Sequence, residues 1–556
     1  MKFFARVSVP VLIMMLCLNL HSFPQGSNNF EILKNLEIYS SILKELDKNY
    51  AEEINPGDLN EIAIEAMLED LDPYTVYIPE SQSEDYKLLT TGQYGGIGAL
   101  IHRQGDYVVI SEPYEGSPAQ KSGLKAGDRI LEINGQSAKG KSTEEVSEIL
   151  KGQPGVTLEI KIQGYSDEEP VIREVVRENI KIPNIPYYGM IGENIAYIML
   201  ANFAKNAGDE VKKALTELKS NNDVKGVILD LRGNGGGLLH EAVNLANIFV
   251  DKGNLIVSTK GKISSRNTDY YTLMPAVDSQ IPVVVLVDGS SASASEIVAG
   301  AIQDLDRGVI IGQKTFGKGL VQNVVPLPYN SQLKITVSKY YISSGRCIQA
   351  IDYFHKDGNG NSSKIPDSLI SEFKTKNGRS VYDGGGIEPD ITTDEYDYSS
   401  ITAALVTKFL IFDYANRFYS THPTIDQPEM FQVDDLIYDD FLAFLQDKDY
   451  DYKTRTEESL EDLMKDAQDE DYFSAIQEDY EIMKRKLSHD KEADLLKHKE
   501  EIRELLREEI VSRYYYQKGR IIANIGQDKD IERAVEVLVQ QSTYLAILNG
   551  TYQEGN

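Results

Sequence analysis

Short apolar runs and apolar residues at helical spacing divide the chain into regions of different character. Helical spacing dominates residues 27–90 and returns in a Lys- and Glu-rich segment that contains Leu495, Ile502 and Ile510. Between these regions, strands are predicted at 194–202, 224–231, 281–287 and 333–341, and a helix at 208–218. Strands that alternate with helices predict an α/β layer in the middle of the chain.

A serine-rich run follows the predicted strand at 281–287. Apolar residues then recur at helical spacing from Ile297 to Leu305, so the serines lie where a strand turns into a helix. The free N–H groups and the positive dipole end of a helix N-terminus would stabilise a negative oxygen there. Ser293 and Glu296 also fit a capping box, in which Ser caps the helix and Glu reaches back. On this run alone, a structural role is favoured.

Lys318 adds a candidate base. It lies between two glycines and leads into a second predicted strand at 320–325, whose alternation places Lys318 and Gln322 on one face. A lysine can take the proton of a serine nucleophile only when it is neutral. From a reference pKa of about 10.4, the site must lower the lysine pKa by roughly 3 units, or about 4 kcal/mol, which burial can supply. Gln322 is uncharged, so it could orient the amine without stabilising its charged form.

Two linked motifs carry a family resemblance. Gly-Ser-Ser-Ala-Ser-Ala-Ser-Glu-Ile at 289–297 and Thr-Phe-Gly-Lys-Gly-Leu-Val-Gln at 315–322 resemble the active-site signature of the carboxyl-terminal processing (tail-specific) serine proteases. The resemblance implies that Ser293 is the nucleophile, Lys318 the base and Gln322 the support of the lysine. The implied fold is α/β, with a crotonase/ClpP-like core of ββα units, an inserted PDZ domain, and helical N- and C-terminal regions.

A second resemblance, to PDZ domains, begins at a glycine-rich loop. Its residues are Tyr94, Gly95, Gly96, Ile97 and Gly98, and the segments 117–119, 123–128 and 130–135 and a predicted helix at 143–150 follow in the order of that fold. Glycines let the backbone approach a ligand closely. The resemblance implies that the N–H groups of this loop hold the terminal carboxylate of a peptide, which adds as a strand.

A third glycine-rich segment, Asp-Leu-Arg-Gly-Asn-Gly-Gly-Gly at 230–237, follows a predicted strand. Such a segment can form an anion-binding nest, but the Gly-Lys-Ser/Thr ending of a nucleotide loop is missing. In the protease family this loop binds substrate backbone and lends an N–H to the oxyanion hole. The resemblance implies the backbones of Gly236 and Ala294 as donors. Relatives usually carry Asn-Asn-Pro-Gly-Gly where residues 233–237 stand, so the choice of N–H stays open.

The motif order predicts five regions. They are a signal peptide at 1–25, a helical region at 26–90, a PDZ domain at 91–165, the Ser/Lys protease core at 166–395 and a helical C-terminal domain at 396–556. A basic start followed by an apolar stretch at 7–20 indicates the signal peptide, and that stretch is too short for a convincing membrane span. We expect an exported protein, periplasmic or in the cell envelope, with an uncleaved N-terminal anchor as an alternative.

The amino-acid composition limits the kinds of partner, metal and cofactor that the protein is expected to bind. The formal net charge of −30, from 87 acidic and 57 basic residues, argues against nucleic acid. Of two cysteines, Cys17 lies in the signal region, which leaves Cys347 without an intramolecular disulfide partner in the mature chain. We interpret Cys347 as a packing residue and not a nucleophile. No Cys/His cluster suggests a metal, and no cofactor is expected.

The preferred function is a serine endopeptidase that recognises the C-terminal tail of protein substrates through its PDZ domain and cleaves through an acyl-enzyme. Its partners are proteins or peptides with free, apolar C-termini, with an adaptor or self-association through the C-terminal helices as a further option. One alternative is a catalytically inactive periplasmic PDZ scaffold. Another is a hydrolase with His240 as base, although its helical spacing beside Leu239 and Val243 predicts a packing histidine.

Overall fold

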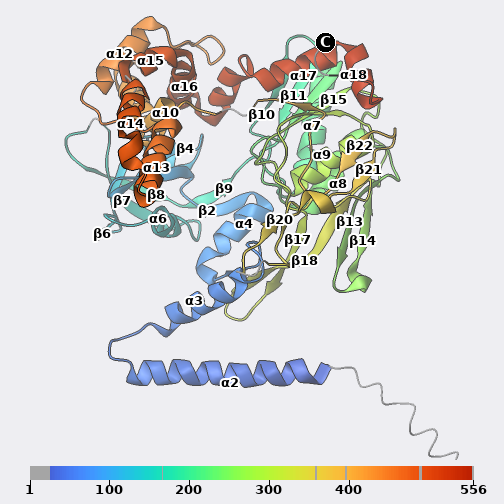
Figure 1. Ribbon diagram of the computed structural model, residues 1–556, viewed down its shortest axis with the longest axis horizontal. Helices are drawn as coiled ribbons and strands as arrows, with labels where there is room; N and C mark the ends of the chain where they lie inside the picture. Colours follow the sequence, from blue (N-terminus) through green and yellow to red (C-terminus); the bar gives the residue numbers. More distant parts are fainter. Residues whose placement is uncertain (1–24, 166, 357–359, 395–396, 488–490, 554–556) are drawn as a thin grey trace, which may run out of the picture. The chain divides into compact units, whose positions relative to one another are not determined.

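The computed structural model describes residues 25–165, 167–356, 360–394, 397–487 and 491–553 (Figure 1). The predictions for residues 1–24, which include the signal peptide and Cys17, lie outside the described residues. The chain divides into two compact units between Tyr77 and Ile78.

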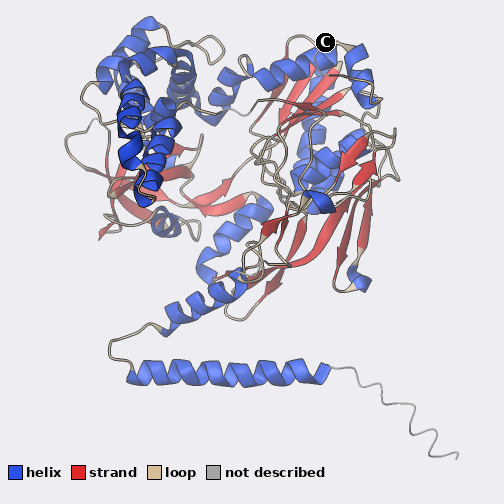
Figure 2. Cartoon of the chain, in the orientation of Figure 1, coloured by secondary structure: helices blue, strands red, loops and turns tan. Residues whose placement is uncertain are grey.

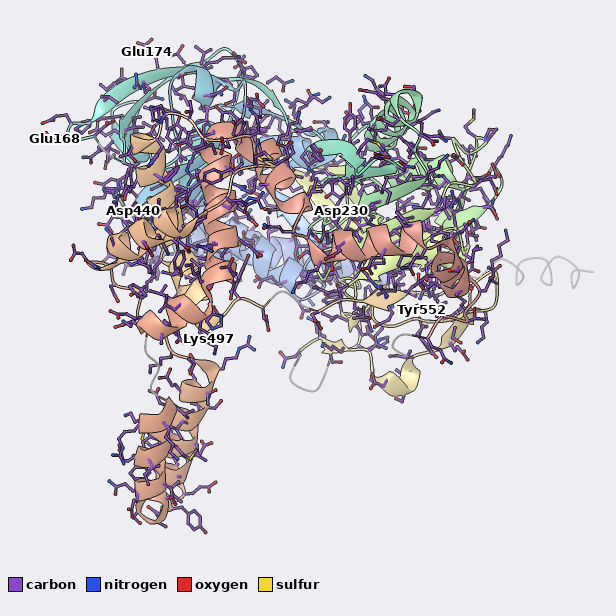
Figure 3. The ribbon with its side chains drawn as sticks, turned by 90° about the horizontal axis from the view of Figure 1, so that it is seen from above. Glu168, Glu174, Asp230, Asp440, Lys497 and Tyr552 are labelled. Carbon is purple, nitrogen blue, oxygen red and sulfur yellow. The ribbon has the colours of Figure 1, made fainter. Side chains whose placement is uncertain are left out.

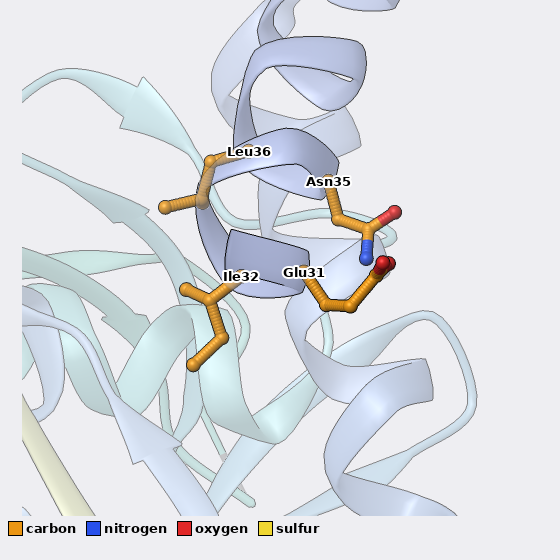
Figure 4. A pocket seen from close by; sticks show the side chains of 4 residues that line it. All are labelled: Glu31, Ile32, Asn35 and Leu36. Carbon is orange, nitrogen blue, oxygen red and sulfur yellow. The ribbon is translucent and has the colours of Figure 1, made fainter. Parts of the chain in front are cut away.

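The first unit is helical, as predicted, and consists of α2 (Gln25–Asn49) and α3 (Pro56–Glu69). The Asn55 side chain accepts a hydrogen bond from the Gly57 N–H, and this caps α3. Apolar side chains of α2 face solvent: Ile32 is 56% exposed and Leu36 58% (Figure 4). Among the described residues, no helix combines the length and the apolar character needed to cross a bilayer.

The second unit begins at the end of a short strand, β1 (Val76–Ile78), and continues into α4 (Ser83–Thr91). An antiparallel sheet of order β3-β4-β5-β7-β8 follows, in which β3 is an edge strand. Its strands are β3 (Ala99–Gln104), β4 (Tyr107–Pro113), β5 (Arg129–Ile133), β7 (Thr157–Gln163) and β8 (Val171–Val176). The predicted helix is confirmed as α6 (Thr143–Leu150), which contacts β3. Because β8 pairs with β7, this sheet continues past the predicted boundary at residue 165.

A six-stranded sheet forms the centre of the second unit, in the order β10-β11-β12-β15-β16-β23. Its strands are β10 (Tyr187–Ile191), β11 (Ile195–Met199), β12 (Gly226–Asp230), β15 (Val283–Val287), β16 (Val309–Gly312) and β23 (Ile391–Thr392). All neighbours are parallel except β10 and β11. The strands predicted at 194–202, 224–231 and 281–287 are confirmed with slightly shorter bounds.

Both faces of this sheet are buried. On β15, Val283 and Val285 belong to the hydrophobic cluster with α7 (Ala207–Asn221), α8 (Leu239–Phe249) and α9 (Ala294–Asp304). The alternate residues Val284 and Leu286 pack instead with α17 (Lys529–Val539) and α18 (Gln541–Leu548). Continuous apolar strands are expected for a sheet covered on both faces.

A second antiparallel sheet adjoins α8 and α9 (Figure 2). It contains β13 (Leu255–Gly261), β14 (Thr268–Tyr271), β17 (Leu320–Pro326) and β18 (Gln332–Ile342). β18 lies between β17 and β13, and it carries the fully buried Tyr340 toward α9. The strands predicted at 320–325 and 333–341 are thus confirmed.

The C-terminal region is helical, as predicted, but it is divided between two hydrophobic clusters. An aromatic-rich cluster around Tyr414 and Phe441 joins residues of α10 to α12, α15 and α16. These helices and their neighbours are α10 (Ser400–Thr407), α11 (Leu410–Thr421), α12 (Asp435–Leu445), α13 (Arg455–Asp469), α14 (Phe473–Leu487), α15 (Lys491–Lys497) and α16 (Lys499–Ile525). The last two helices pack on the central sheet, so the predicted 396–556 region is not one separate body.

Candidate active site

Ser293 occupies a strained turn between β15 and α9. It is the N-cap of α9, with φ 56° and ψ −109°. A positive φ is unfavourable for a residue with a Cβ, and such strain persists only where neighbouring contacts hold the backbone. Here the Glu296 carboxylate accepts the Ser293 N–H at 2.8 Å.

The neighbouring serines have structural roles. The buried Ser291 hydroxyl donates to the Leu231 carbonyl at 2.8 Å, and the buried Ser295 hydroxyl donates to the Asn234 carbonyl at the same distance. Both bonds tie the turn to the glycine-rich segment after β12. Ser293 is partly exposed and Ser290 is exposed at the turn. The structure therefore separates Ser293 from the two serines whose hydroxyls hold the fold.

Glu296 connects the two sequence motifs. Its side chain is fully buried and accepts hydrogen bonds from five groups. The donors are the N–H groups of Ser293 (2.8 Å), Gly317 (2.7 Å) and Lys318 (3.1 Å) and the hydroxyls of Thr315 (2.7 Å) and Tyr340 (3.1 Å). The backbones of Ser293 and Lys318 share the same oxygen, Oε2. Residues 25 positions apart in the chain are thus brought to one point.

Burial raises the pKa of Glu296, and the hydrogen bonds from Thr315, Ser293, Gly317 and Lys318 oppose that rise. Burial also raises the pKa of Tyr340 well above its ordinary value, with the Glu296 carboxylate adding to the shift. Tyr340 therefore keeps its proton and remains a donor to Glu296. The sequence predicts only a capping role for Glu296, because its contacts with residues 315–318 and Tyr340 depend on tertiary structure.

The structure corrects the strand argument for Lys318 and Gln322. Lys318 precedes β17, which begins at Leu320, and Gly319 between them has φ 65°. A positive φ interrupts the extended backbone that strand alternation requires, so a shared strand face does not follow. The Gln322 amide donates to the Thr336 hydroxyl at 3.3 Å. The catalytic roles of Lys318 and Gln322 stay predictions.

The glycine-rich loop lies directly against Ser293. A Cβ added to Gly236 would be 2.7 Å from the Ala292 carbonyl oxygen, 2.8 Å from the Ser293 Cβ and 2.9 Å from the Ala294 nitrogen. Gly236 also has φ 99°, so glycine is required on both grounds. This close approach places the loop where an oxyanion hole for Ser293 would be.

The two N–H groups predicted to form the oxyanion hole, those of Gly236 and Ala294, differ in their hydrogen bonding. The Gly236 N–H donates to the Asn234 side-chain oxygen at 2.9 Å, so it must be released or shared to serve an oxyanion. The Ala294 N–H lies in the first turn of α9, where backbone donors lack helical partners. Both assignments stay predictions.

The predicted carboxylate-binding loop is only partly available. Tyr94, Gly95 and Gly96 form β2 (Gln93–Gly96), which pairs with β9 (Glu178–Lys181). The Gly95 N–H donates to the Glu84 carboxylate at 2.7 Å. Ile97 and Gly98 follow β2 and precede the edge strand β3, so they are the better placed donors for a peptide carboxylate.

Two further residues, His240 and Cys347, have no catalytic setting. The His240 side chain is 61% exposed on α8, and its Nε2 lies 3.5 Å from the Glu241 carboxylate. The face of α8 that packs on the core carries Ala242 and Val243 instead. Its predicted packing role is therefore wrong. Burial raises the pKa of the Cys347 thiol, which disfavours the thiolate a nucleophile requires.

Known proteins match this chain in three segments and over much of its length. A model of peptidase family S41 matches residues 194–355, a PDZ model matches 109–164, and a model of the C-terminal helical domain of probable PDZ-proteases matches 401–538. The carboxy-terminal-processing protease of Bartonella bacilliformis is 33% identical over 328 residues, which are 58% of this chain and 75% of that protein. The chain belongs to peptidase family S41.

Other relatives agree with this assignment. A probable CtpA-like serine protease of Staphylococcus aureus is 33% identical over 380 residues, or 67% of this chain and 68% of the relative. The solved photosystem II D1 C-terminal processing protease is 26% identical and aligns over 65% of this chain and 94% of its own, with a TM-score of 0.35. The family assignment and the PDZ match make this chain a serine-type peptidase with a PDZ domain, and its sheets and helices form an α/β core.

Proposed function

We propose that the S41 peptidase cleaves protein substrates at a Ser/Lys site formed by Ser293 and Lys318. The observation that carries this proposal is the buried Glu296 carboxylate, which binds the backbone N–H groups of both residues through one oxygen. The supporting observation is the close approach of Gly236 to the Ser293 turn, because the proposed oxyanion hole requires the loop backbone to lie beside the nucleophile.

The proposed reaction proceeds through an acyl-enzyme. The neutral Lys318 amine takes the Ser293 hydroxyl proton as the oxygen bonds to the scissile carbonyl carbon. N–H groups of the glycine loop and of Ala294 stabilise the resulting oxyanion. Lys318 then gives the proton to the leaving amine, and water hydrolyses the Ser293 ester. Gln322 orients the lysine without stabilising its charged form.

We assign substrate selection to the PDZ domain. β3 is an edge strand beside α6, so a peptide can add to its free edge. The N–H groups of Ile97 and Gly98 are the proposed donors to the terminal carboxylate, and an apolar tail is the proposed ligand. The N-terminal sequence supports export to the periplasm or cell envelope as the setting of this reaction.

The test is digestion of an unstructured protein with an apolar C-terminal tail by wild type, Ser293→Ala and Lys318→Ala. Lys314→Ala is a matched control, because Lys314 is 52% exposed and pairs with Glu388 at the surface. Wild type and the control should cut, the two site variants should be inactive, and amidation of the tail should slow cleavage.

Activity in Ser293→Ala or Lys318→Ala would overturn the Ser/Lys assignment. If wild type and all three variants bind the tail but none of them cleaves it, the inactive PDZ scaffold is favoured. Equal cleavage of the free and the amidated tail would contradict carboxylate recognition by the PDZ domain.

A further inference from the structure

An ion-pair cluster joins the active-site loop to the C-terminal helices. Arg232 is the third residue of the glycine-rich segment, and its guanidinium is bound by three carboxylates. Nη2 lies 2.6 Å from Asp230 and 2.9 Å from Asp528, and Nη1 lies 3.1 Å from Asp528 and 3.0 Å from Asp530. Residues almost 300 positions apart in sequence thus meet beside the catalytic turn (Figure 3 labels Asp230).

The cluster is well shielded and geometrically defined. The Arg232 side chain is 20% exposed, and those of Asp528 and Asp530 are 22% and 18% exposed. Burial lowers the pKa of Arg232, but Asp230 and Asp528 raise it by more, so the guanidinium stays charged. Asp230 is nearly fully buried and also accepts the Tyr197 hydroxyl at 2.8 Å. A planar guanidinium held by forked contacts has little freedom to rotate.

The C-terminal side of the cluster is anchored independently. Asp528 is the N-cap of α17 and accepts the N–H groups of Asp530 and Ile531, each at 3.0 Å. Apolar residues of α17, among them Val537, pack against the central sheet. The carboxylates that hold Arg232 are therefore fixed to the core by helix capping and by apolar burial.

The loop side of the cluster leads to Ser293 within a few residues. The Gly233 N–H donates to Asp288 at 2.9 Å, and Asp288 also accepts the N–H groups of Ser290 and Ser291 in the turn before Ser293. Four residues after Arg232, Gly236 lies so close to Ser293 that an added Cβ would be 2.8 Å from the Ser293 Cβ. A displacement of Arg232 would therefore move the proposed oxyanion donors.

We propose that Arg232, clamped by Asp528 and Asp530, is a positioning residue that holds the glycine-rich loop against Ser293, so that the C-terminal helices take part in catalysis. This inference rests on the proposed function of the Ser293 site. Arg232 acts through the loop backbone and not on the substrate. Its loss should therefore lower kcat much more than it changes KM.

The test uses the full-length peptidase with Asp528→Asn and Asp530→Asn combined. Asparagine is nearly isosteric and is also a good N-cap, so α17 keeps its cap while the cluster loses two charges. The matched control is Glu536→Gln, which removes the exposed Arg533–Glu536 pair from the same helix. Peptide hydrolysis gives kcat and KM, and circular dichroism and thermal unfolding report folding.

We expect kcat of the double variant to fall by about 10- to 100-fold, which is below the loss of a whole oxyanion donor. KM should change less than about threefold, and Glu536→Gln should match wild type. In an Arg232→Gln variant, the two Asp substitutions should lower kcat little further, because the two carboxylates affect catalysis only by holding Arg232.

An unchanged kcat in a folded double variant would overturn the proposal, whatever its melting temperature. If the double variant does not fold, Asp530→Asn alone decides, because Asp528 still caps α17: a reduced kcat supports the clamp and a wild-type kcat refutes it. Ser293→Ala, measured in parallel, separates the two claims: activity in that variant refutes the nucleophile assignment, whereas the Asp variants report on the clamp alone.

Discussion

At the scale of single residues, one hydrogen bond links the strained backbone of Ser293 to the buried carboxylate of Glu296. The strained turn directs the Ser293 N–H toward the carboxylate, and the carboxylate is held by four further donors. The motifs in the sequence predict Ser293 and Lys318 as the reacting pair, because local chemistry marks both. They could not reveal how Glu296 joins them, since that depends on contacts with residues far along the chain.

Replacing Glu296 with Gln should destabilise the peptidase and abolish most activity. A glutamine offers one acceptor oxygen and turns an NH₂ group toward donors, which leaves buried donors unpaired. We expect a loss of about 2–4 kcal/mol in the free energy of unfolding, measured by urea denaturation. Glu388→Gln is the control, because its pair with Lys314 is exposed and worth little. Wild-type stability of Glu296→Gln would show that the five contacts are not required.

At the scale of elements, the glycine-rich loop and the α9 turn form one unit. The Asn234 carbonyl accepts the Ala292 N–H at 3.1 Å and the Ser295 hydroxyl at 2.8 Å. The sequence predicts that the glycine-rich segment follows a strand, and β12 confirms this. The register irregularity between β17 and β18, where Val337 of β18 is the extra residue, was not predictable, because a bulge depends on the pairing of two strands and not on the pattern of one.

Gly236→Ala should reduce activity strongly, because the new Cβ collides with backbone atoms at Ala292 and Ala294. Gly235→Ala is a matched control one residue away, where an added Cβ meets nothing within 4 Å. We expect kcat to fall by at least about 100-fold for Gly236→Ala, comparable to loss of an oxyanion donor, and to change little for Gly235→Ala. Equal kcat values for the two variants would contradict the proposed closeness of loop and nucleophile.

The contribution of Asp128, just before β5 in the PDZ sheet, to folding stability depends on pH. Burial raises the pKa of Asp128 to about 6, although a hydrogen bond from the Lys125 N–H opposes the shift. Because the folded pKa exceeds the unfolded value, this group favours folding below about pH 4, and its contribution is lost as pH rises toward 6. Asp128→Asn should therefore gain stability relative to wild type over this range, by on the order of 2–3 kcal/mol.

Thermal unfolding of wild type and Asp128→Asn at pH 4, 5, 6 and 7 measures this change. Asp106→Asn is the control, because the Asp106 side chain is 65% exposed in the same domain. A stability difference between wild type and Asp128→Asn that stays constant with pH would refute the assignment.

At the scale of the second unit, the last two C-terminal helices belong to the hydrophobic core of the peptidase. α17 and α18 bury one face of the central sheet, and the Tyr544 hydroxyl accepts the Val283 N–H at 3.1 Å and donates to the Arg307 carbonyl at 3.2 Å. Amphipathic spacing predicts that a helix buries one face, but it does not say against which partner. This explains why the sequence predicted the helices and not their division between two clusters.

Val537→Ala should lower the stability of the whole protease core. Val537 is 1% exposed on α17, whereas Val539, two residues on, is 71% exposed. Truncating the buried side chain should cost about 1–3 kcal/mol in the free energy of unfolding, and Val539→Ala should cost less than about 0.5 kcal/mol. Denaturant unfolding of both variants measures the difference, and equal stabilities would place α17 outside the core.

The most direct test of the Ser/Lys account is to find the covalent intermediate. A peptide ester with an apolar acyl group, mixed with the peptidase and quenched in acid, should leave an acyl adduct that mass spectrometry of protein fragments maps to Ser293. The adduct should form much more slowly in Lys318→Ala and be absent in Ser293→Ala. An adduct on another residue, or ester hydrolysis by Ser293→Ala at the wild-type rate, would contradict the account.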